Sequence, residues 1–235
     1  MEKVVCIVPA AGAGRRMGLG YNKVFVRLLG VPLIVRCLAM LAQTGLVSRV
    51  IVALAPEETA EGRSFLERYR SEYFSGLPLE VVAGGSQRQD SVANALAVVT
   101  ENEGYVAVHD GARPFAGREI FARTLALAEK YGAAVAAVPV KNTIKQIDEK
   151  GLVTATPERA SLRAVQTPQI FKIQLLKRAY GHLRDFPAAV TDDASVVELL
   201  GAPVAVAEGA YTNIKITTPE DLALAERIIG DEDDR

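Results

Sequence analysis

The sequence is poor in the residues that build disulfide-linked and metal-stabilised folds. Its 235 residues include two cysteines and no tryptophan. Cys6 and Cys37 lie far apart in the sequence and form no C-x-x-C pair, which argues against a disulfide scaffold and a structural zinc site. Unpaired thiols are typical of a reducing compartment, so we expect a cytoplasmic protein.

The sequence also lacks an excess of positive charge and a long hydrophobic run. Lys and Arg total 27 against 28 Asp and Glu, which gives a net charge of −1. Proteins that bind nucleic acid usually carry a basic surplus, so we expect no nucleic-acid partner. No run of about 18 apolar residues occurs, and basic residues follow the first apolar run rather than precede it. We therefore expect neither a membrane span nor a signal peptide.

Short β-branched runs alternate with longer segments that have helical periodicity. Strands are predicted over residues 3–9, 50–55, 79–83, 106–109 and 133–140. Helices are predicted over residues 33–42, 90–99, 118–131 and 191–200, with a last helix that opens at residue 218. This order predicts an α/β fold with a Rossmann-like, mainly parallel sheet flanked by helices. The length suits a single domain over residues 1–235.

One segment interrupts the alternation of strands and helices. Residues 141–159 hold two short β-prone runs around a turn at Gly151, which predicts a protruding β-hairpin arm over about residues 140–160. The segment is polar, and an isolated hairpin is only marginally stable in water. It is either a solvated surface hairpin or an arm held by a second subunit. We favour the second interpretation, which predicts a homodimer formed through the arm.

The loop after the first predicted strand favours a phosphate-bearing ligand. Residues 10–18 contain Gly12 and Gly14, which let the backbone approach a ligand closely. The third glycine of a dinucleotide fingerprint is replaced by methionine, and the Gly-Lys-Ser/Thr of a Walker A loop does not occur. Arg16 and Lys23 bring positive charge to the loop, which suits a polyphosphate. The alternative is a tight strand-to-helix turn flanked by solvated charges.

Polar residues also follow other predicted strands, and ligands of open parallel sheets bind outside the carboxyl ends of the strands. Asp110 could hold a divalent cation or a ribose hydroxyl, and Arg113 could meet a phosphate. The alternative for Asp110 is a helix cap or a turn residue. Residues 84–91 could read a base edge or form an ordinary loop. Lys215 is predicted in the middle of a strand over residues 213–217, where a solvated lysine is the default interpretation.

Six short blocks, spread in order along nearly the whole chain, share their residues with one known family. They are Ala10-Ala11-Gly12-x-Gly14-x-Arg16-Met17 with Lys23, Gly84-Gly85-x-x-Arg88-x-x-Ser91, His109-Asp110-Gly111-Ala112-Arg113-Pro114, Thr167-Pro168-Gln169, Thr191-Asp192-Asp193-Ala194-Ser195 and Asn213-Ile214-Lys215. On these blocks the chain resembles the 2-C-methyl-D-erythritol 4-phosphate cytidylyltransferases of the non-mevalonate isoprenoid pathway. The resemblance implies a fold of the nucleotidyltransferase type. It also implies transfer of CMP from CTP to methylerythritol phosphate, with release of pyrophosphate.

The resemblance further implies roles for individual residues. Arg16 and Lys23 would stabilise the transition state, and Lys215 and Arg159 would position the attacking phosphate. Arg159 lies on the arm, so it would reach the active site of a partner subunit, with Thr143 beside it. The residues expected to bind CTP are Ala10, Ala11, Gly12, Gly14, Gly85, Arg88, Ser91, Asp110 and Gly111. The residues expected to line the acceptor pocket are Arg113, Thr143, Thr167 and Thr191. Mg²⁺ is the implied cofactor, held mainly by phosphate oxygens, with Asp110 as its protein ligand.

Two positions depart from the family's pattern. Asn22 stands where the family usually has proline before Lys23, so we expect a more mobile loop, because proline fixes φ. Ser86 stands where the family often has an acidic residue, which weakens the assignment of the base contacts.

Two other functions remain as alternatives. A cytidylyltransferase for ribitol 5-phosphate, or for another sugar-alcohol phosphate, would share the nucleotide half of the site and differ in the acceptor pocket. A non-catalytic nucleotide-binding module would keep the glycine loop. Such a module has no need to keep Arg16, Lys23, Arg159 and Lys215 together, so their joint presence argues against it.

Overall fold

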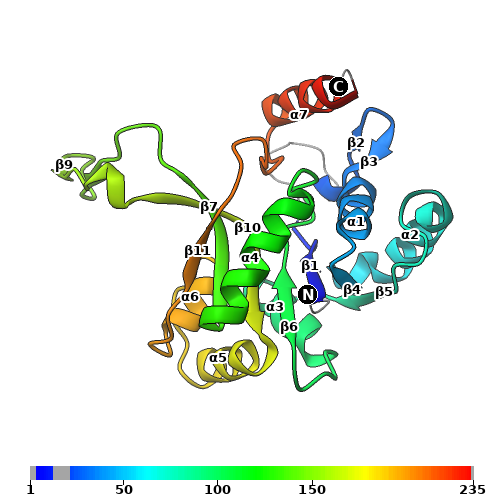
Figure 1. Ribbon diagram of the computed structural model, residues 1–235, viewed down its shortest axis with the longest axis horizontal. Helices are drawn as coiled ribbons and strands as arrows, with labels where there is room; N and C mark the ends of the chain where they lie inside the picture. Colours follow the sequence, from blue (N-terminus) through cyan, green and yellow to red (C-terminus); the bar gives the residue numbers. More distant parts are fainter. Residues whose placement is uncertain (1–3, 13–21, 234–235) are drawn as a thin grey trace.

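A seven-stranded sheet forms the centre of the molecule (Figure 1). The computed structural model describes residues 4–12 and 22–233. The strands follow the spatial order β11-β7-β10-β6-β1-β4-β5. Their bounds are β1 (Val4–Pro9), β4 (Val47–Leu54), β5 (Leu79–Ala83), β6 (Tyr105–Val108), β7 (Ala133–Pro139), β10 (Arg163–Lys172) and β11 (Ala205–Glu208). Neighbouring strands run parallel, except that β10 is antiparallel to both β6 and β7. The predicted mainly parallel sheet is confirmed.

Helices cover both faces of this sheet. Helices α1 (Leu33–Thr44), α2 (Thr59–Tyr73) and α4 (Gly117–Tyr131) pack on one face, and α3 (Arg88–Ala97), α5 (Ile173–Asp185) and α6 (Asp193–Glu198) pack on the other. Helix α7 (Pro219–Asp233) packs apart from them, against Leu28 and Ile216. Short 3-10 turns occur at η2 (Lys23–Phe25), η3 (Pro56–Glu58) and η4 (Arg159–Ser161). The strands predicted over residues 3–9, 50–55, 79–83, 106–109 and 133–140 and all five predicted helices are present, with ends shifted by a few residues.

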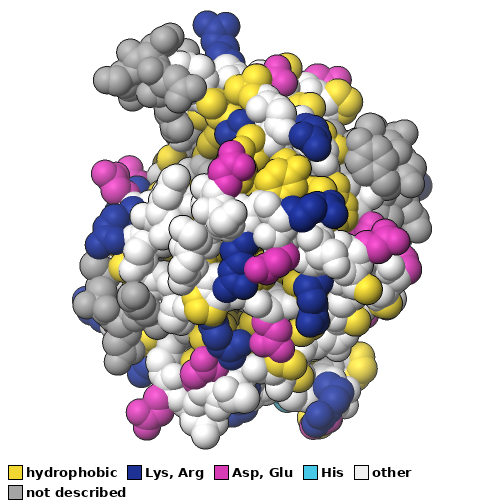
Figure 2. Space-filling view, turned by 90° about the vertical axis from the view of Figure 1, so that its right-hand side faces the viewer, with side chains coloured by type: hydrophobic (Ala, Val, Ile, Leu, Met, Phe, Trp, Pro, Cys, Tyr) yellow, Lys and Arg dark blue, Asp and Glu magenta, His cyan; other side chains and the backbone are white. Residues whose placement is uncertain are grey.

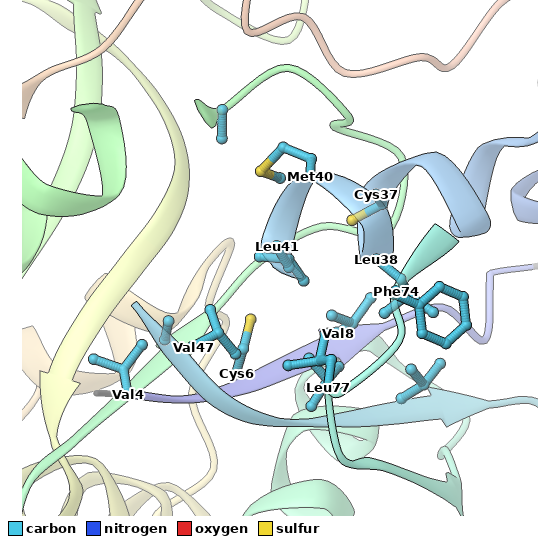
Figure 3. Packing of buried hydrophobic residues seen from close by; sticks show 14 of the residues in the cluster. Val4, Cys6, Val8, Cys37, Leu38, Met40, Leu41, Val47, Phe74 and Leu77 are labelled. Carbon is cyan, nitrogen blue, oxygen red and sulfur yellow. The ribbon is translucent and has the colours of Figure 1, made fainter. Parts of the chain in front are cut away.

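Strand β1 shows why the first apolar run is continuous rather than alternating. Cys6 and Val8 pack into one hydrophobic cluster with residues of α1, α2 and α4. Val5 and Ile7 point to the opposite face and pack with residues of α3, α5 and α6. A parallel strand covered by helices on both faces needs apolar side chains at every position. In Figure 3, Cys6 and Val8 of β1 lie in the same packed layer as Cys37 of α1, and both cysteines are buried and free.

Three long elements, strand β10 and helices α2 and α5, were not predicted. The reasons for β10 and α2 differ. Strand β10 carries Pro168 and polar side chains in the interior of the sheet, a composition that argues against a central strand. Its register on β7 shifts between Val165 and Gln169, and this irregularity accommodates the proline. Helix α2 is rich in charged residues, and only Gly62 and Leu66 are buried in it, so its apolar period is weak.

The prediction of a strand over residues 213–217 is wrong. The segment is irregular, because its backbone bonds form no ladder: Asn213 and Ile214 bond within the turn before it, and Ile216 N–H donates to the Ala112 carbonyl at 2.9 Å. A third hydrophobic cluster fixes the segment in place. Ile216 packs there with Leu28 of the small β2–β3 hairpin (Arg27–Leu28 and Val31–Pro32) and with Ala225 of α7.

The predicted hairpin arm is present. Strands β8 (Gln146–Ile147) and β9 (Val153–Ala155) pair antiparallel around the turn at Asp148, whose carboxylate accepts bonds from two backbone N–H groups. Figure 1 shows the arm at the left, at the end of the molecule remote from α2. Its apolar side chains Ile147, Leu152 and Val153 are 59–63% exposed. The arm therefore contributes little to the core of its own chain.

The face that carries α2 has a mixed surface. Figure 2 shows Lys and Arg side chains interspersed with Asp and Glu side chains over this face. Within the described residues, no helix is long and apolar enough to cross a membrane.

Candidate active site

A pocket of about 550 Å³ opens at the carboxyl ends of β1, β5 and β6. The chain runs outward from β1 through β4 to β5 and then returns to β6 on the other side of β1. A crevice forms where the direction of winding reverses, and ligands of open α/β sheets bind there. The sequence-predicted residues that line this pocket are Ala10, Ala11, Gly12, Lys23, Gly85, Arg88, Ser91, Asp110, Gly111 and Lys215.

The loop after β5 is held by hydrogen bonds between residues that lie close together in the sequence. Ser91 Oγ accepts from Gly85 N–H at 3.1 Å and lies 3.2 Å from the Gln87 carbonyl, to which it donates. Asp90 accepts from the backbone N–H of Gln87 at 3.0 Å and from the hydroxyl of Ser86 at 2.9 Å. A Cβ at Gly85 would lie 2.2 Å from the Cβ of Asp90, so glycine is required at this position. Ser86 thus stabilises the loop through its hydrogen bond to Asp90.

Asn22 fixes the residue before Lys23. Its side-chain amide donates to the Ala10 carbonyl at 2.6 Å and to Glu58 at 2.8 Å, and its oxygen accepts from Val24 N–H at 3.3 Å. These bonds hold Asn22 in place, and the expectation of a more mobile loop stays a prediction. The loop over residues 13–21 lies outside the described residues.

Asp110 is the centre of the charges in the pocket. Its Oδ2 lies 2.8 Å from Lys215 Nζ and 3.6 Å from Arg113 Nε, and its Oδ1 lies 3.5 Å from Arg88 Nε. Burial alone would raise the pKa of Asp110, but Lys215, Arg88 and Arg113 together lower it well below its ordinary value. Asp110 is therefore ionised at neutral pH, and its side chain pairs with cations rather than capping a helix.

A second layer of buried polar groups holds Arg88. Arg88 Nη2 lies 2.7 Å from the carboxylate of Asp193, and the hydroxyl of Tyr180 donates to the same carboxylate at 2.7 Å. The side-chain oxygen of Gln169 accepts from the backbone N–H groups of Asp193 and Ala194 at 3.1 and 3.0 Å. These contacts connect α3, α5, α6 and β10 behind the pocket.

His109 and Thr167 form a hydrogen-bond chain beneath Asp110. His109 Nε2 lies 2.8 Å from the Arg113 carbonyl, so this nitrogen carries the proton. Nδ1 then accepts from the hydroxyl of Thr167 at 3.1 Å, and the oxygen of that hydroxyl accepts from Asp110 N–H at 3.1 Å. Burial, together with the positive charge of Arg113, lowers the pKa of His109 to about 4. The ring is neutral at physiological pH.

Comparison with known proteins agrees with this geometry. The sequence profile of the family described as 2-C-methyl-D-erythritol 4-phosphate cytidylyltransferase matches residues 4–231. The chain belongs to this family.

Individual members of the family match the chain along nearly its whole length. A cytidylyltransferase of that name from Bacillus mycoides is 47% identical over 223 residues, which cover 95% of this chain and 96% of the relative. The crystal structure of the cytidylyltransferase from Thermus thermophilus superposes with a TM-score of 0.76 at 36% identity and covers 97% of this chain and 98% of its own. The 4-diphosphocytidyl-2C-methyl-D-erythritol synthase from Anaerococcus prevotii gives a TM-score of 0.83 at 27% identity, with 97% and 99% covered.

The remaining residues that the resemblance assigned to the site lie in different places. Arg16 and Gly14 lie outside the described residues. Arg113 adjoins the pocket through Asp110 and donates to the Asn213 carbonyl at 2.7 Å. Thr143 and Arg159 are exposed on the arm, where Arg159 donates to the Lys141 carbonyl at 3.1 Å.

Two threonines assigned to the acceptor pocket differ in their surroundings. Thr167 is 4% exposed, and its hydroxyl is occupied as a donor and as an acceptor inside the protein. Thr191 is exposed just before α6, and its backbone N–H donates to Ser195 Oγ at 3.2 Å. Their contact with a substrate stays a prediction, and in this structure Thr167 orients the Asp110 backbone.

Several residues that shape the site were not predicted as functional. Asn22, Gln169, Tyr180 and Asp193 act on the pocket through other side chains, by the bonds described above. Gln169 and Asp193 stand inside two of the blocks that carry the family resemblance. For Gln169 a signal was available, since a polar residue directly before the apolar Ile170 and Phe171 indicates a buried group that must be hydrogen-bonded.

A metal could be held at one carboxylate. The described residues contain no group of three or more His, Cys, Asp or Glu side chains that could bind a metal ion. Asp110 is the one carboxylate among the described residues that line the pocket, and it is ionised. Magnesium sites often combine one or two carboxylates with substrate phosphates and water, and a single carboxylate fits that pattern.

The neutral His109 ring predicts a pH-dependent stability. Unfolding exposes a histidine whose pKa rises from about 4 to its ordinary value of 6.5. The unfolded chain then binds more protons than the folded chain below pH 6.5, so stability is lost as the pH falls. Between pH 7 and pH 5 we expect this histidine to lower the free energy of unfolding by about 2 kcal/mol.

Urea denaturation at both pH values tests this prediction. His109→Gln keeps a donor and an acceptor but does not titrate, so its loss of stability between the two pH values is smaller by about that amount. His182→Gln, at the chain's other histidine, is the matched control and behaves like the wild type. Equal pH dependence in wild type and His109→Gln would contradict the assignment.

Proposed function

We propose that the protein transfers CMP from CTP to 2-C-methyl-D-erythritol 4-phosphate and releases pyrophosphate. The observation that carries the proposal is the convergence of Lys23, Arg88 and Lys215 on a pocket at the reversal point of the sheet, in a chain that belongs to this family. Glycine and alanine backbone at Ala10–Gly12 and Gly85 leaves room for a nucleotide beside these cations.

The reaction needs charge stabilisation rather than a general base. One phosphate oxygen of the acceptor forms a bond to the α-phosphorus of CTP, while the bond from that phosphorus to the oxygen bridging to the β-phosphate breaks. Pyrophosphate leaves with that electron pair. A phosphate monoester is largely dianionic at neutral pH, because its second pKa is about 6, so the attacking oxygen is already deprotonated. The protein's task is therefore to position the two phosphates and to stabilise the transition state.

Lys23 and Lys215 are well placed for this task. Lys23 Nζ donates to the Ile216 carbonyl at 3.0 Å, which brings the two lysines to neighbouring positions on the pocket wall. We assign Lys23, with Arg16, to the negative charge that develops around the α-phosphorus. We assign Lys215 to the attacking phosphate, for which it would exchange its contact with Asp110.

The proposal includes Mg²⁺ as the metal cofactor. Asp110 would hold it, together with phosphate oxygens of CTP. When bound, the ion would neutralise charge on the phosphates and favour departure of pyrophosphate. Asp110 is suited to this role because its three cationic neighbours keep it ionised.

The proposal also includes a homodimer in which the arms are exchanged. The arm exposes Ile147, Leu152 and Val153 and lies at the end of the molecule remote from α2. Apolar side chains on a two-stranded hairpin gain stability when a second surface covers them. In such a dimer, Arg159 and Thr143 would complete the acceptor site of the other subunit.

We further place the enzyme in the cytoplasm. Cys6 and Cys37 are both free and fully buried in the hydrophobic core. Free thiols persist in a reducing compartment, which supports this location.

Pyrophosphate release from CTP and Mg²⁺ tests the reaction and the acceptor together. We expect strong turnover with methylerythritol phosphate and none with ribitol 5-phosphate. Turnover with ribitol 5-phosphate instead would contradict the proposed acceptor and keep the nucleotide half of the site. Absence of turnover with either acceptor would contradict the proposed reaction.

Lys23→Ala tests the assignment of the transition-state charge. We expect a folded protein whose kcat is lower by roughly 100-fold or more, the scale for loss of one transition-state charge contact. Lys130→Ala, which removes an exposed lysine on α4, is the matched control and should keep wild-type kcat. Near-full activity of Lys23→Ala would remove Lys23 from the mechanism.

Mixed dimers test the exchange of arms. When Lys23→Ala chains are mixed with Arg159→Ala chains, each mixed dimer regains one site that has both Lys23 and the arginine of the other subunit. Random mixing should then restore about a quarter of the wild-type activity, because half of the dimers are mixed and each has one of two sites intact. No recovery, with mixed dimers shown to form, would mean that Arg159 acts in its own subunit or not at all.

A further inference from the structure

The side chain of Asn22, the residue before Lys23 of the pocket wall, is buried and makes three hydrogen bonds. Asn22 is 3% exposed. Its Nδ2 donates to the Ala10 carbonyl at 2.6 Å and to Glu58 Oε2 at 2.8 Å. Its Oδ1 accepts from Val24 N–H at 3.3 Å. Both amide hydrogens are thus used, and the orientation of the amide is fixed by the chemistry of its partners.

These bonds join three segments that are separate in the sequence. Ala10 directly follows β1 and lines the pocket, and Val24 belongs to η2, the turn that also carries Lys23. Glu58 ends η3 at the start of α2. Asn22 therefore connects η2, which carries Lys23, to the end of β1 on one side and to the start of α2 on the other.

The backbone at Asn22 shows what the side chain achieves. Its φ is −66° and its ψ is 121°, and it caps the N-terminus of η2. A proline ring would impose nearly the same φ by a covalent constraint. Here hydrogen bonds from the side chain hold the position instead. Phe25, at the other end of η2, packs edge-on against Phe65 of α2, with 5.1 Å between the ring centroids. Both ends of the turn are therefore held.

We propose that Asn22 is a positioning residue for Lys23, acting through its bridge from Ala10 to Glu58; this inference rests on the proposed function. Lys23 has a long, flexible side chain, and its ammonium reaches a useful position only if its backbone is held. A displacement of about 1 Å at a catalytic group can cost about 100-fold in rate. The bridge sets the position of Lys23 relative to the reacting phosphates. Breaking it leaves the contacts of the other loops with the nucleotide in place.

Asn22→Asp is the most direct test. The carboxylate keeps an acceptor for Val24 N–H but places an oxygen, in place of the amide donor, against the Ala10 carbonyl and the Glu58 carboxylate. We expect kcat to fall by about 10- to 100-fold, while KM for CTP changes by less than about threefold. Asn22→Ala removes all three bonds without adding charge and should also lower kcat while KM for CTP stays nearly unchanged. It replaces Asn22→Asp in the test if that variant is poorly folded.

Rescue at Glu58 separates positioning from general damage. Glu58→Gln alone should keep wild-type activity, because its side-chain oxygen still accepts from Asn22. In the Asn22→Asp background, Glu58→Gln supplies an amide that donates to the new carboxylate and restores the bridge. We then expect kcat to rise by about 10-fold over that of Asn22→Asp alone, because Lys23 returns to its position. Glu57→Gln, the neighbouring exposed carboxylate on η3, is the matched control and should give no recovery.

The outcomes distinguish this inference from the proposed function. A wild-type enzyme without cytidylyl transfer would contradict the proposed function itself. An active wild type with unchanged kcat in both Asn22→Asp and Asn22→Ala would overturn the positioning role. Recovery with Glu57→Gln as large as that with Glu58→Gln, or no recovery with either, would also overturn it.

Discussion

The pocket depends on one buried carboxylate. Asp110 is 7% exposed and pairs with Arg88 from α3, Arg113 from the loop after β6 and Lys215 from the segment before α7. Three cations so close together would repel one another without an anion between them. Removing one partner from a buried ion pair typically costs about 3–5 kcal/mol, because the remaining charge is left uncompensated. Asp110 thus joins three segments that the chain supplies from distant positions.

The same arrangement prepares the pocket for phosphates. A cation that is already held by a carboxylate does not have to be reoriented when a charged ligand enters, and such preorganised charge is the largest contribution in many active sites. Lys215, about one third exposed, lies at the edge of the cluster and can turn toward a second anion. Arg88 is held from behind by Asp193 and is less free to do so. The cluster therefore contains both fixed charges and one adaptable charge.

Neutral polar groups complete the framework around these charges. The amides of Gln169 and Asn22 and the hydroxyls of Ser91 and Thr167 each join a loop to a neighbouring element through directed hydrogen bonds. Apolar packing is non-directional and fills the core on both faces of β1. Hydrogen bonds have preferred angles, so they can hold a loop in one conformation at the rim of that core.

The sequence by itself determined the alternation of strands and helices, the buried character of β1 and the loops that carry the site. These features depend on the local period of apolar residues and on glycine, both of which are readable along the chain. The family blocks pointed to most of the residues that line the pocket.

Only the tertiary structure decided which polar residues support the site. Strand β10 lies between β6 and β7 although it carries Pro168 and Gln169, because its polar side chains bond to loops far away in the sequence. Residues 213–217 are irregular because Ile216 packs under α7 and Lys215 meets Asp110. The backbone at Asn22, which a proline ring would constrain covalently, is held by hydrogen bonds to Ala10 and to Glu58, 36 positions away. Contacts of this kind join residues with no periodic relation, so a local pattern carries no record of them.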